Sequence, residues 1–194
     1  MNEWFEHIPT ADMIAWRRHI HQHPELSFNE YKTSAFVEKT LRSFGDIEIQ
    51  HPAQTSVLAI IHGAQEGKTI LLRADMDALP MQEESGLSFS SDVNNVAHTC
   101  GHDTHTAMLL ATAKVLYELK DSLHGSVKLI FQHAEELNPG GSQAIVDSGL
   151  IDDVDAVVGL HIIPNLPCGS IHVHPSGPAT TAADGFFLHI QGKG

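Results

Sequence analysis

The sequence predicts an α/β fold in which a parallel or mixed sheet is flanked by helices on both faces. Two observations favour this fold. Short apolar runs typical of strands alternate along the chain with segments of helical spacing. The composition, 42% hydrophobic and 18% charged over 194 residues, is that of a globular chain with one sizeable core and room for the start of a second domain.

Four segments are expected to be helical. The first stops before Pro24, and the second begins with Ser27 and Glu30 in the spacing of a capping box. Gly45 follows the apolar stripe of the second segment, where a C-cap glycine belongs. The predicted helices cover residues 11–22, 27–45, 103–119 and 141–149.

Four apolar runs predict strands. The first two lie on either side of a turn at "GAQEGK", and the last two lie on either side of the fourth helix. The predicted strands cover residues 56–62, 69–74, 126–132 and 155–161.

The composition of the chain changes from Pro164 onward, where the segment is rich in proline, glycine and small residues. This segment precedes the alternating run "GFFLHIQGKG", which has strand character. The sequence therefore predicts one domain over residues 1–182 and the start of a second domain over residues 183–194.

The charge of the chain limits its partners. The formal net charge is −13 with neutral histidines, and such a chain repels phosphate backbones and anionic membranes. No apolar run reaches 18 residues, and the N-terminus lacks a signal-peptide pattern. Two cysteines form no disulfide framework. We therefore expect a cytoplasmic protein that binds neither nucleic acid nor membranes.

Polar side chains come directly after three of the predicted strands. The histidine-rich stretch 97–108 lies at the start of a predicted helix. In open α/β sheets, ligands bind outside the carboxyl ends of the strands, so these segments are expected to meet at one rim. The residues that follow the strands are Arg73, Asp75 and Asp77, then Gln132, His133, Glu135 and Glu136, and finally His161.

Several of these residues also have structural interpretations. A lone cysteine is usually a small buried hydrophobic residue, but the neighbouring His102 favours a ligand role for Cys100. Asp103 can equally serve as an N-cap, and His105 is expected to cap or solvate the start of the helix. Turn-forming, solvated or strand-end roles stay open for Asp75, Asp77, Glu135, Glu136 and His161.

Two groups of histidines are expected outside the site. One group crowds the end of the first helix, where a cation complements the helix dipole: His19, His21 and His23. The other group alternates in strand-like segments and is expected at the surface: His172, His174 and His189.

The rim supplies the ligands of a borderline-soft divalent ion, Zn²⁺ above all, with Mn²⁺ or Co²⁺ as alternatives. Closed structural zinc sites tend to use several cysteines close in sequence, whereas these ligands are scattered and include one cysteine, which favours a catalytic site. Glu135 is then a natural general base. The predicted metal ligands are Cys100, His102, Glu136 and His161.

Five motifs of the chain carry a further signal: "RRHIHQHPELSFNEYKTS", "LLRADMDALPMQE", "AHTCGHDTHTAML", "FQHAEELNPGG" and "GLHIIPNLPCGSI". In order and spacing they resemble the M20 metallopeptidase family, and its amidohydrolase branch most of all. The branch includes hippurate hydrolases, indole-acetyl-amino-acid hydrolases, and N-acyl-amino-acid and N-acetyl-diaminopimelate deacetylases.

The resemblance implies an α/β catalytic domain interrupted by a smaller α+β lid domain that usually mediates dimerisation. It implies two divalent ions, Zn²⁺ or Mn²⁺ with Co²⁺ or Ni²⁺ as alternatives, that share a bridging water. The four ligands above match family ligands, with the thiolate of Cys100 in a bridging position, and Glu135 matches the general base. Asp75 matches an aspartate that orients a metal-bound histidine, with Arg73 in the place of a histidine.

Two departures from the family pattern stand out. His133 occupies a position where the branch commonly has proline, and the chain ends at Gly194, before the family's fifth ligand, a histidine near the C-terminus. We therefore expect part of a homodimeric amidohydrolase that cleaves N-acyl amino acids and is inactive in this truncated form. A dipeptidase and a metal-binding, non-catalytic fragment are the alternatives.

Overall fold

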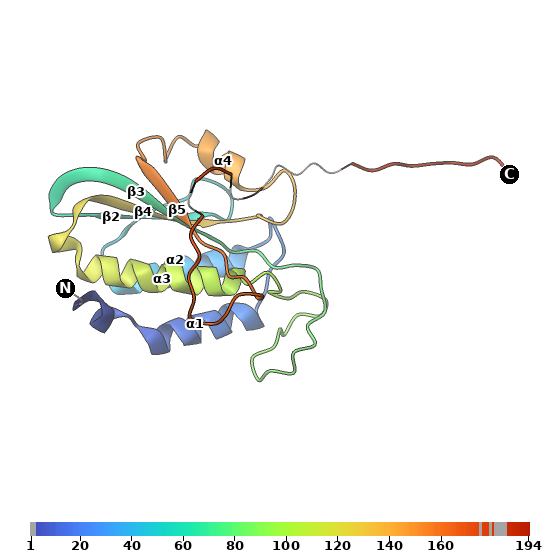
Figure 1. Ribbon diagram of the computed structural model, residues 1–194, viewed down its shortest axis with the longest axis horizontal. Helices are drawn as coiled ribbons and strands as arrows, with labels where there is room; N and C mark the ends of the chain where they lie inside the picture. The colour runs from blue at the N-terminus through green and yellow to red at the C-terminus, as the bar shows by residue number, and fades with distance from the viewer. Residues whose placement is uncertain (1–2, 175, 179, 181–185) are drawn as a thin grey trace. The chain divides into compact units, whose positions relative to one another are not determined.

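A five-stranded sheet lies at the centre of the unit Met1–Ile162, with strand order β1–β2–β4–β3–β5 (Figure 1). The computed structural model describes residues 3–174, 176–178, 180 and 186–194. The strands are β1 (Glu48–Gln50), β2 (Val57–His62), β3 (Gln65–Asp75), β4 (His124–Gln132) and β5 (Ala156–Gly159).

The sheet is mixed, as predicted. β3 runs parallel to both β4 and β5, whereas β2 runs antiparallel to β4 and to β1. The carboxyl ends of β3, β4 and β5 therefore meet at one edge. β3 begins at Gln65, inside the turn predicted at residues 63–68, and its register with β4 is irregular between Gln65 and Thr69. β1 has no counterpart among the predicted strands.

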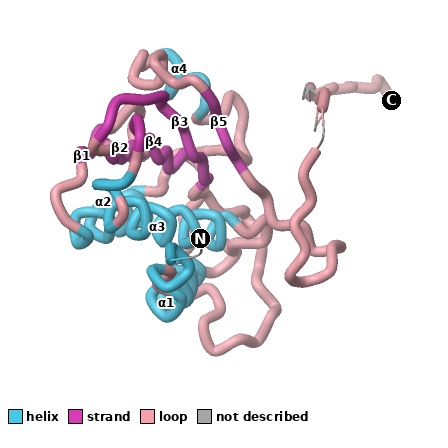
Figure 2. Tube along the Cα trace, turned by 60° about the vertical axis from the view of Figure 1, so that its left-hand side comes forward, coloured by secondary structure: helices cyan, strands magenta, loops and turns pink. Residues whose placement is uncertain are grey.

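Helices cover both faces of the sheet. Figures 1 and 2 show α2 and α3 against one face with α1 beyond them, and α4 on the other face. The α-helices are α1 (Thr10–Gln22), α2 (Tyr31–Phe44), α3 (His102–Glu118) and α4 (Ser142–Asp147), and the short 3₁₀ helices are η1 (Glu3–His7) and η2 (Lys120–Ser122).

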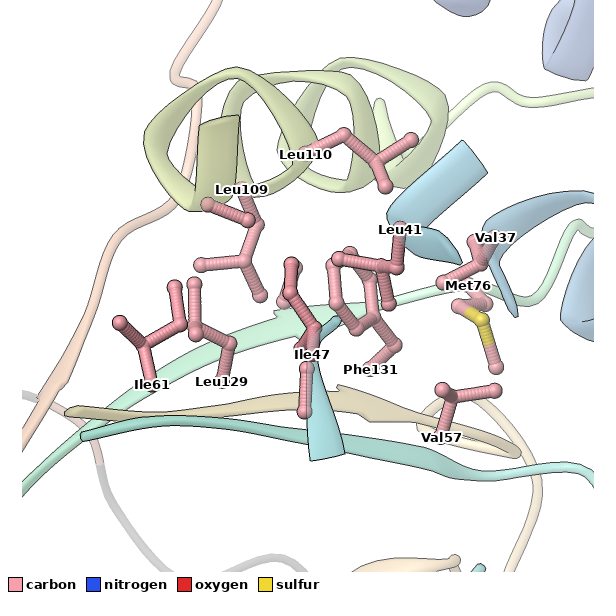
Figure 3. Packing of buried hydrophobic residues seen from close by; sticks show 13 residues of the cluster. Val37, Leu41, Ile47, Val57, Ile61, Met76, Leu109, Leu110, Leu129 and Phe131 are labelled. Carbon is pink, nitrogen blue, oxygen red and sulfur yellow. The ribbon is translucent and has the colours of Figure 1, made fainter. Parts of the chain in front are cut away.

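The strands β2 and β4 have mostly apolar sequences because side chains on both of their faces are packed against other elements. Val57, Ala59 and Ile61 join a core with α2 and α3, which also includes Leu129 and Phe131 (Figure 3). The residues between them face the other way and pack with Ile145 of α4: Leu58, Ile60 and Ile130. Because side chains alternate along a strand, a strand covered on both faces has no polar face.

The ends of α2 differ in how well the sequence predicts them. Gly45 is the C-cap, at φ +147°, and an added Cβ would lie 2.2 Å from the Tyr117 hydroxyl. The predicted capping box at the other end is wrong, because α2 begins at Tyr31 and the Ser27 hydroxyl donates to Asp77 instead. The Glu30 side chain makes no capping hydrogen bond.

The unit Ile163–Gly194 contains no helix or strand among its described residues. The strand expected in "GFFLHIQGKG" is not formed over residues 186–194, where the side chains are exposed. The predicted start of a second domain falls partly outside the described residues and stays a prediction. Among the described helices, none combines the length and the apolar character needed to cross a bilayer.

Candidate metal centre

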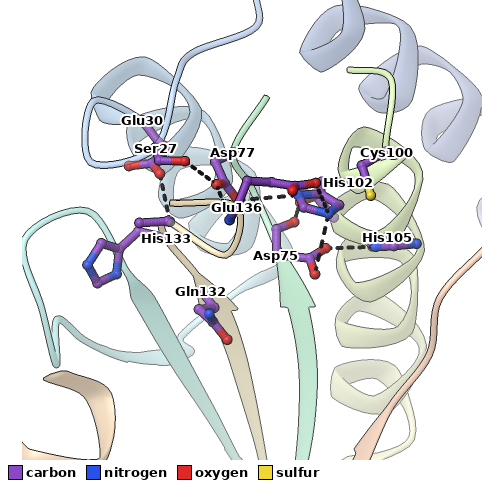
Figure 4. A network of polar contacts seen from close by, with 12 residues as sticks. Ser27, Glu30, Asp75, Asp77, Cys100, His102, His105, Gln132, His133 and Glu136 are labelled. Atoms are coloured by element: carbon purple, nitrogen blue, oxygen red, sulfur yellow. Dashed lines mark hydrogen bonds and ion pairs between the residues drawn. The ribbon is translucent and has the colours of Figure 1, made fainter. Parts of the chain in front are cut away.

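The edge formed by β3, β4 and β5 collects polar side chains next to the start of α3 (Figure 4). Asp75 is the last residue of β3, and His102 is the first residue of α3. The loop 133–136 follows the last residue of β4, and His161 lies two residues after β5. The structure thus brings the four segments with predicted site residues to one rim.

His102 lies at the centre of this cluster and is fully buried. Its Nδ1 donates a hydrogen bond to Asp77 Oδ1 at 3.3 Å. Its Nε2 lies 3.7 Å from Glu136 Oε1, and neither atom has a hydrogen-bond partner among the described residues. A buried imidazole nitrogen and a buried carboxylate oxygen that face each other without hydrogen-bond partners are the arrangement expected around a cation.

Cys100 and His161 lie on the more open side of the cluster. Cys100 Sγ is 3.4 Å from His161 Nε2, and His161 Nδ1 donates to the carbonyl oxygen of Ile162 at 2.7 Å. That hydrogen bond leaves the Nε2 lone pair free to bind a cation. Burial raises the pKa of the Cys100 thiol to about 12, and the nearby Glu136 carboxylate adds to the shift. A cation bound at this sulfur would favour the thiolate.

Three overlapping groups of side chains can each bring donor atoms within 4.8 Å of one another, and His102 belongs to all three. Two ligand atoms that each bind one ion at about 2.0–2.3 Å lie at most about 4.6 Å apart. The distances of 3.4 Å between Cys100 Sγ and His161 Nε2 and of 3.7 Å between His102 Nε2 and Glu136 Oε1 lie within that limit. The donor set and its spacing therefore fit a divalent ion. The groups are Cys100, His102 and His161; His102, Glu135 and Glu136; and Asp75, His102 and His105.

Asp77 contacts the central histidine more closely than Asp75 does. Asp75 Oδ2 lies 3.7 Å from His102 Nε2, and Asp75 otherwise pairs with His105 and Arg73, each at 2.7 Å. Burial would raise the pKa of Asp77, but hydrogen bonds from His102, Ser27 and the Glu136 backbone outweigh it and hold the pKa well below its usual range. Burial would likewise raise the pKa of Asp75, but the hydrogen bond from His105 and the charge of Arg73 outweigh burial and lower that pKa.

Residues 71–185, more than half of the chain, match peptidase family M20/M25/M40. The chain belongs to this family. The matched segment contains the whole cluster from Asp75 to His161, and the mixed sheet with helices on both faces is the fold of the M20 structures that the chain resembles.

Named relatives of this M20 chain include amidohydrolases. The N-acyl-L-amino acid amidohydrolase of Geobacillus stearothermophilus is 52% identical over 184 residues, which cover 95% of this chain and 50% of that protein. The N-acetyl-L-cysteine deacetylase of Bacillus subtilis is 46% identical over 183 residues, which cover 94% of this chain and 43% of that protein. This chain therefore spans about half the length of these curated relatives.

A crystal structure of the YxeP protein of Bacillus subtilis, a dinuclear metal-binding peptidase from the M20 family, superposes on the chain with a TM-score of 0.77. The two are 41% identical, and the match covers 81% of this chain and 44% of YxeP.

At the start of α3 in the M20 chain, the expectation for His105 is wrong, and the structure decides against the N-cap alternative for Asp103. His105 is buried instead of solvated, because its Nδ1 donates to Asp75 and its Nε2 accepts the Ile162 N–H at 3.0 Å. With both ring nitrogens bonded, His105 has no lone pair left for an ion. Asp103 is not the N-cap, which is Gly101, but lies buried inside the helix.

Asp103 instead joins α3 to α1. Its Oδ2 lies 2.7 Å from Arg17 Nε and accepts a hydrogen bond from His21 Nδ1 at 2.8 Å. His21 lies in the last turn of α1, as predicted, and its Nε2 also contacts Glu83 at 3.1 Å. The hydrogen bond to Asp103 raises the pKa of His21 against the opposing effect of burial.

The histidines expected at the surface, His172, His174 and His189, are exposed. Sequence reasoning placed Asp77 at the rim but gave it no contact with His102. The available signal was the spacing "DMD", which presents two carboxylates two residues apart at a strand end, either of which can reach a neighbouring helix.

Proposed function

We propose that this chain forms the metal-binding part of an amidohydrolase that converts an N-acyl amino acid into a carboxylic acid and a free amino acid. The observation that carries the proposal is the pair of buried donor atoms, His102 Nε2 and Glu136 Oε1, that face each other at 3.7 Å without a hydrogen-bond partner in the described chain. Relatives named for N-acyl-amino-acid hydrolysis and N-acetylcysteine deacetylation support the substrate class.

Four side chains are proposed as ligands for two divalent ions, Zn²⁺ or Mn²⁺, with Co²⁺ or Ni²⁺ as alternatives. The dinuclear metal binding of YxeP supports the number of ions. Such ions, when bound, polarise a carbonyl group and lower the pKa of water to about 7. The proposed ligands are Cys100, His102, Glu136 and His161.

Glu135 is proposed as the general base. Its carboxylate belongs to the same donor cluster as His102 and Glu136, and its side chain is exposed, so it can meet both water and substrate. Glu135 would take a proton from the attacking water and deliver it to the leaving amine nitrogen. Water oxygen then ends in the new carboxyl group, and the amide nitrogen leaves as a neutral amine.

The aspartates are proposed to orient the imidazoles. Asp77 holds a proton on His102 Nδ1, which leaves the Nε2 lone pair for the ion. Asp75, proposed from the family resemblance to orient a metal-bound histidine, reaches His102 at a longer distance and fixes His105 directly.

The activity is proposed for a protein extended to the length of its relatives, because the chain spans about half of them. We propose that such a protein contains residues 1–182 as a catalytic domain and a lid domain from residue 183, dimerises through the lid, and acts in the cytoplasm on small molecules. The 194 residues alone are expected to bind metal with little or no turnover.

A peptidase is the second candidate. It is favoured by thermostable carboxypeptidase 1 of Saccharolobus solfataricus, which is 45% identical over 184 residues. The metal chemistry is the same for both candidates, because each hydrolyses an amide bond through an activated water. A substrate panel that contains both N-acyl amino acids and dipeptides separates them.

The test combines metal content with turnover. After dialysis against Mn²⁺ or Zn²⁺, the 194-residue chain should retain metal by elemental analysis, and Cys100→Ser should lower the retained amount. Cys168→Ser is the matched control, because Cys168 is exposed and lies outside the cluster. The extended protein should hydrolyse N-acyl amino acids. Full metal occupancy in both Cys100→Ser and His102→Ala would refute the ligand assignment.

A further inference from the structure

The loop 133–136, which carries the proposed base and the proposed ligand Glu136, is held at its backbone by side chains from three other segments. Two of these side chains, Glu30 and Asp77, are labelled in Figure 4. The His133 N–H donates to Ser56 Oγ at 3.2 Å, and the Ser56 hydroxyl lies 2.6 Å from His133 Nδ1. The Glu136 N–H donates to Asp77 Oδ2 at 3.0 Å. Between these two contacts, the Ala134 N–H donates to Glu30 Oε1 at 2.8 Å.

Glu30 is the member of this set that the proposed reaction leaves unexplained. It is fully buried, and its Oε1 accepts N–H groups from both Ala134 and Phe28, the latter at 3.0 Å. Its Oε2 accepts the Thr55 hydroxyl at 2.8 Å. Both oxygens of this buried carboxylate accept hydrogen bonds, so its position is fixed by the loop and by Thr55, just before β2, together.

From its position in the sequence, Glu30 would be expected to cap α2, but its side chain makes no capping hydrogen bond. Glu30 is the residue before α2, where a side chain would normally bind the free N–H groups of the first turn. Glu25 binds those groups instead, through the N–H of Lys32 at 3.1 Å and of Thr33 at 2.8 Å. Glu30 is thereby free to point at the loop.

The backbone at both N–H donors to Glu30 Oε1 is unusual. Ala134 has φ +46° and Phe28 has φ +66°, both in the left-handed region that non-glycine residues seldom occupy. Such conformations persist where surrounding contacts hold them, and they concentrate at functional sites. One carboxylate oxygen binds both residues, so it stabilises the turn that points the loop toward His102.

We propose that Glu30 is a positioning residue, which fixes loop 133–136 so that the carboxylates of Glu135 and Glu136 face the metal centre. The proposal rests on the proposed function, since it assigns Glu30 a task only if that loop binds an ion. Glu30 contacts neither ion nor substrate and acts through the backbone of Ala134.

The test uses the 194-residue chain, with two measurements made on each variant: Mn²⁺ or Zn²⁺ affinity by calorimetric titration, and amide hydrogen exchange of residues 133–136. Glu30→Ala should weaken metal affinity by about 10–100-fold, the usual cost of losing a residue that supports a ligand. The same change should accelerate exchange of the Ala134 and Glu136 amides relative to those of β2.

Two further variants separate positioning from general stability. Glu30→Gln should keep affinity within a few-fold, because its amide oxygen still accepts the two N–H groups and the Thr55 hydroxyl can turn to accept from the amide nitrogen. Thr55→Val removes only the donor to Oε2, so it should lower the melting temperature while it leaves metal affinity and exchange of the loop unchanged.

Unchanged affinity and unchanged loop exchange in Glu30→Ala would overturn the proposal, even if the melting temperature fell. If Glu30→Ala does not fold, Glu30→Asp replaces it, because the shorter side chain cannot reach both N–H groups and should show the same two effects. If the unmodified chain bound no ion while its loop exchange still responded to Glu30, the proposed function would fail and the structural role of Glu30 would stand.

Discussion

The two sides of the candidate metal centre differ in how their side chains are held. On the inner side, His102, Asp75 and Asp77 are at most 1% exposed, and each makes contacts with other buried polar groups. On the outer side, His161 follows the exposed strand β5. Its ring bonds to the carbonyl oxygen of the next residue, Ile162, and contacts no buried carboxylate in the described part of the chain. Cys100 is partly exposed.

The inner half of this candidate site is therefore formed without a bound ion. The inner side chains are fixed by packing and hydrogen bonds, which is how proteins preorganise ligands. The outer side chains are more exposed and, among the described residues, lack such contacts with the buried aspartates. The two neighbouring glutamates lie on opposite sides of this division. Glu136 Oε1 is buried next to His102 on the inner side, whereas the Glu135 side chain is exposed on the outer side.

Substitution of each glutamate in turn tests this division most strongly. In the extended, active protein, Glu135→Gln should lower kcat by about 10²–10⁴-fold with metal retained, because the amide keeps the shape but accepts no proton. Glu136→Gln should instead lower metal occupancy. Steady-state kinetics and elemental analysis on the same preparations measure both. The reverse pattern would exchange the two roles and contradict the assignment of the buried carboxylate to the ion.

The second effect compares an inner histidine with an outer one. His102→Ala should cost about 3–5 kcal/mol of unfolding free energy, because it leaves the buried Asp77 carboxylate without its partner. His161→Ala removes an exposed side chain and should change stability by no more than about 0.5 kcal/mol. Both should lose metal. Denaturant unfolding in the presence of a chelator measures stability without the contribution of an ion, and equal losses would show that the two sides are equally rigid.

The sequence predicted the rim because that feature depends on local patterns. Polar residues directly after apolar runs, as in "LLRAD" and "LIFQHAEE", lie at strand ends wherever those strands pair. The parallel pairing of β3 with β4 and β5 then brings Asp75, loop 133–136 and His161 to one edge. The alternation of helical and strand-like runs also predicted the layers correctly, since β2 and β4 each contribute residues to the two apolar clusters on opposite faces of the sheet.

The contacts inside the site could not be predicted in the same way, because they join residues far apart in sequence. Glu30 and Ala134 are 104 residues apart, and their hydrogen bond competes with the local capping box that the sequence favoured. His105 illustrates the same point. A histidine in the first turn of a helix is normally solvated, but here Asp75 and the Ile162 N–H bind both of its ring nitrogens.

The smallest of the three effects concerns Asp77, which links the inner histidine to the glutamate loop. Its Oδ1 accepts the proton of His102 Nδ1, while its Oδ2 accepts the Glu136 N–H and the Ser27 hydroxyl. Asp77→Asn has only one acceptor oxygen, so either His102 or Glu136 loses its partner whichever way the amide turns. We expect affinity for Mn²⁺ or Zn²⁺ to fall by about 10–100-fold.

Ser27→Ala is the matched control for that substitution, because it removes one hydrogen bond to Asp77 and leaves the contacts to His102 and Glu136 in place. A single hydrogen bond contributes about 1 kcal/mol, so affinity should change by less than about fivefold. Titration of the 194-residue chain with both ions measures the two variants side by side. If Asp77→Asn bound metal as tightly as Ser27→Ala, the inner side would not depend on this aspartate. His102 would then be oriented by packing alone, and the contrast between the two sides of the centre would lose its electrostatic basis.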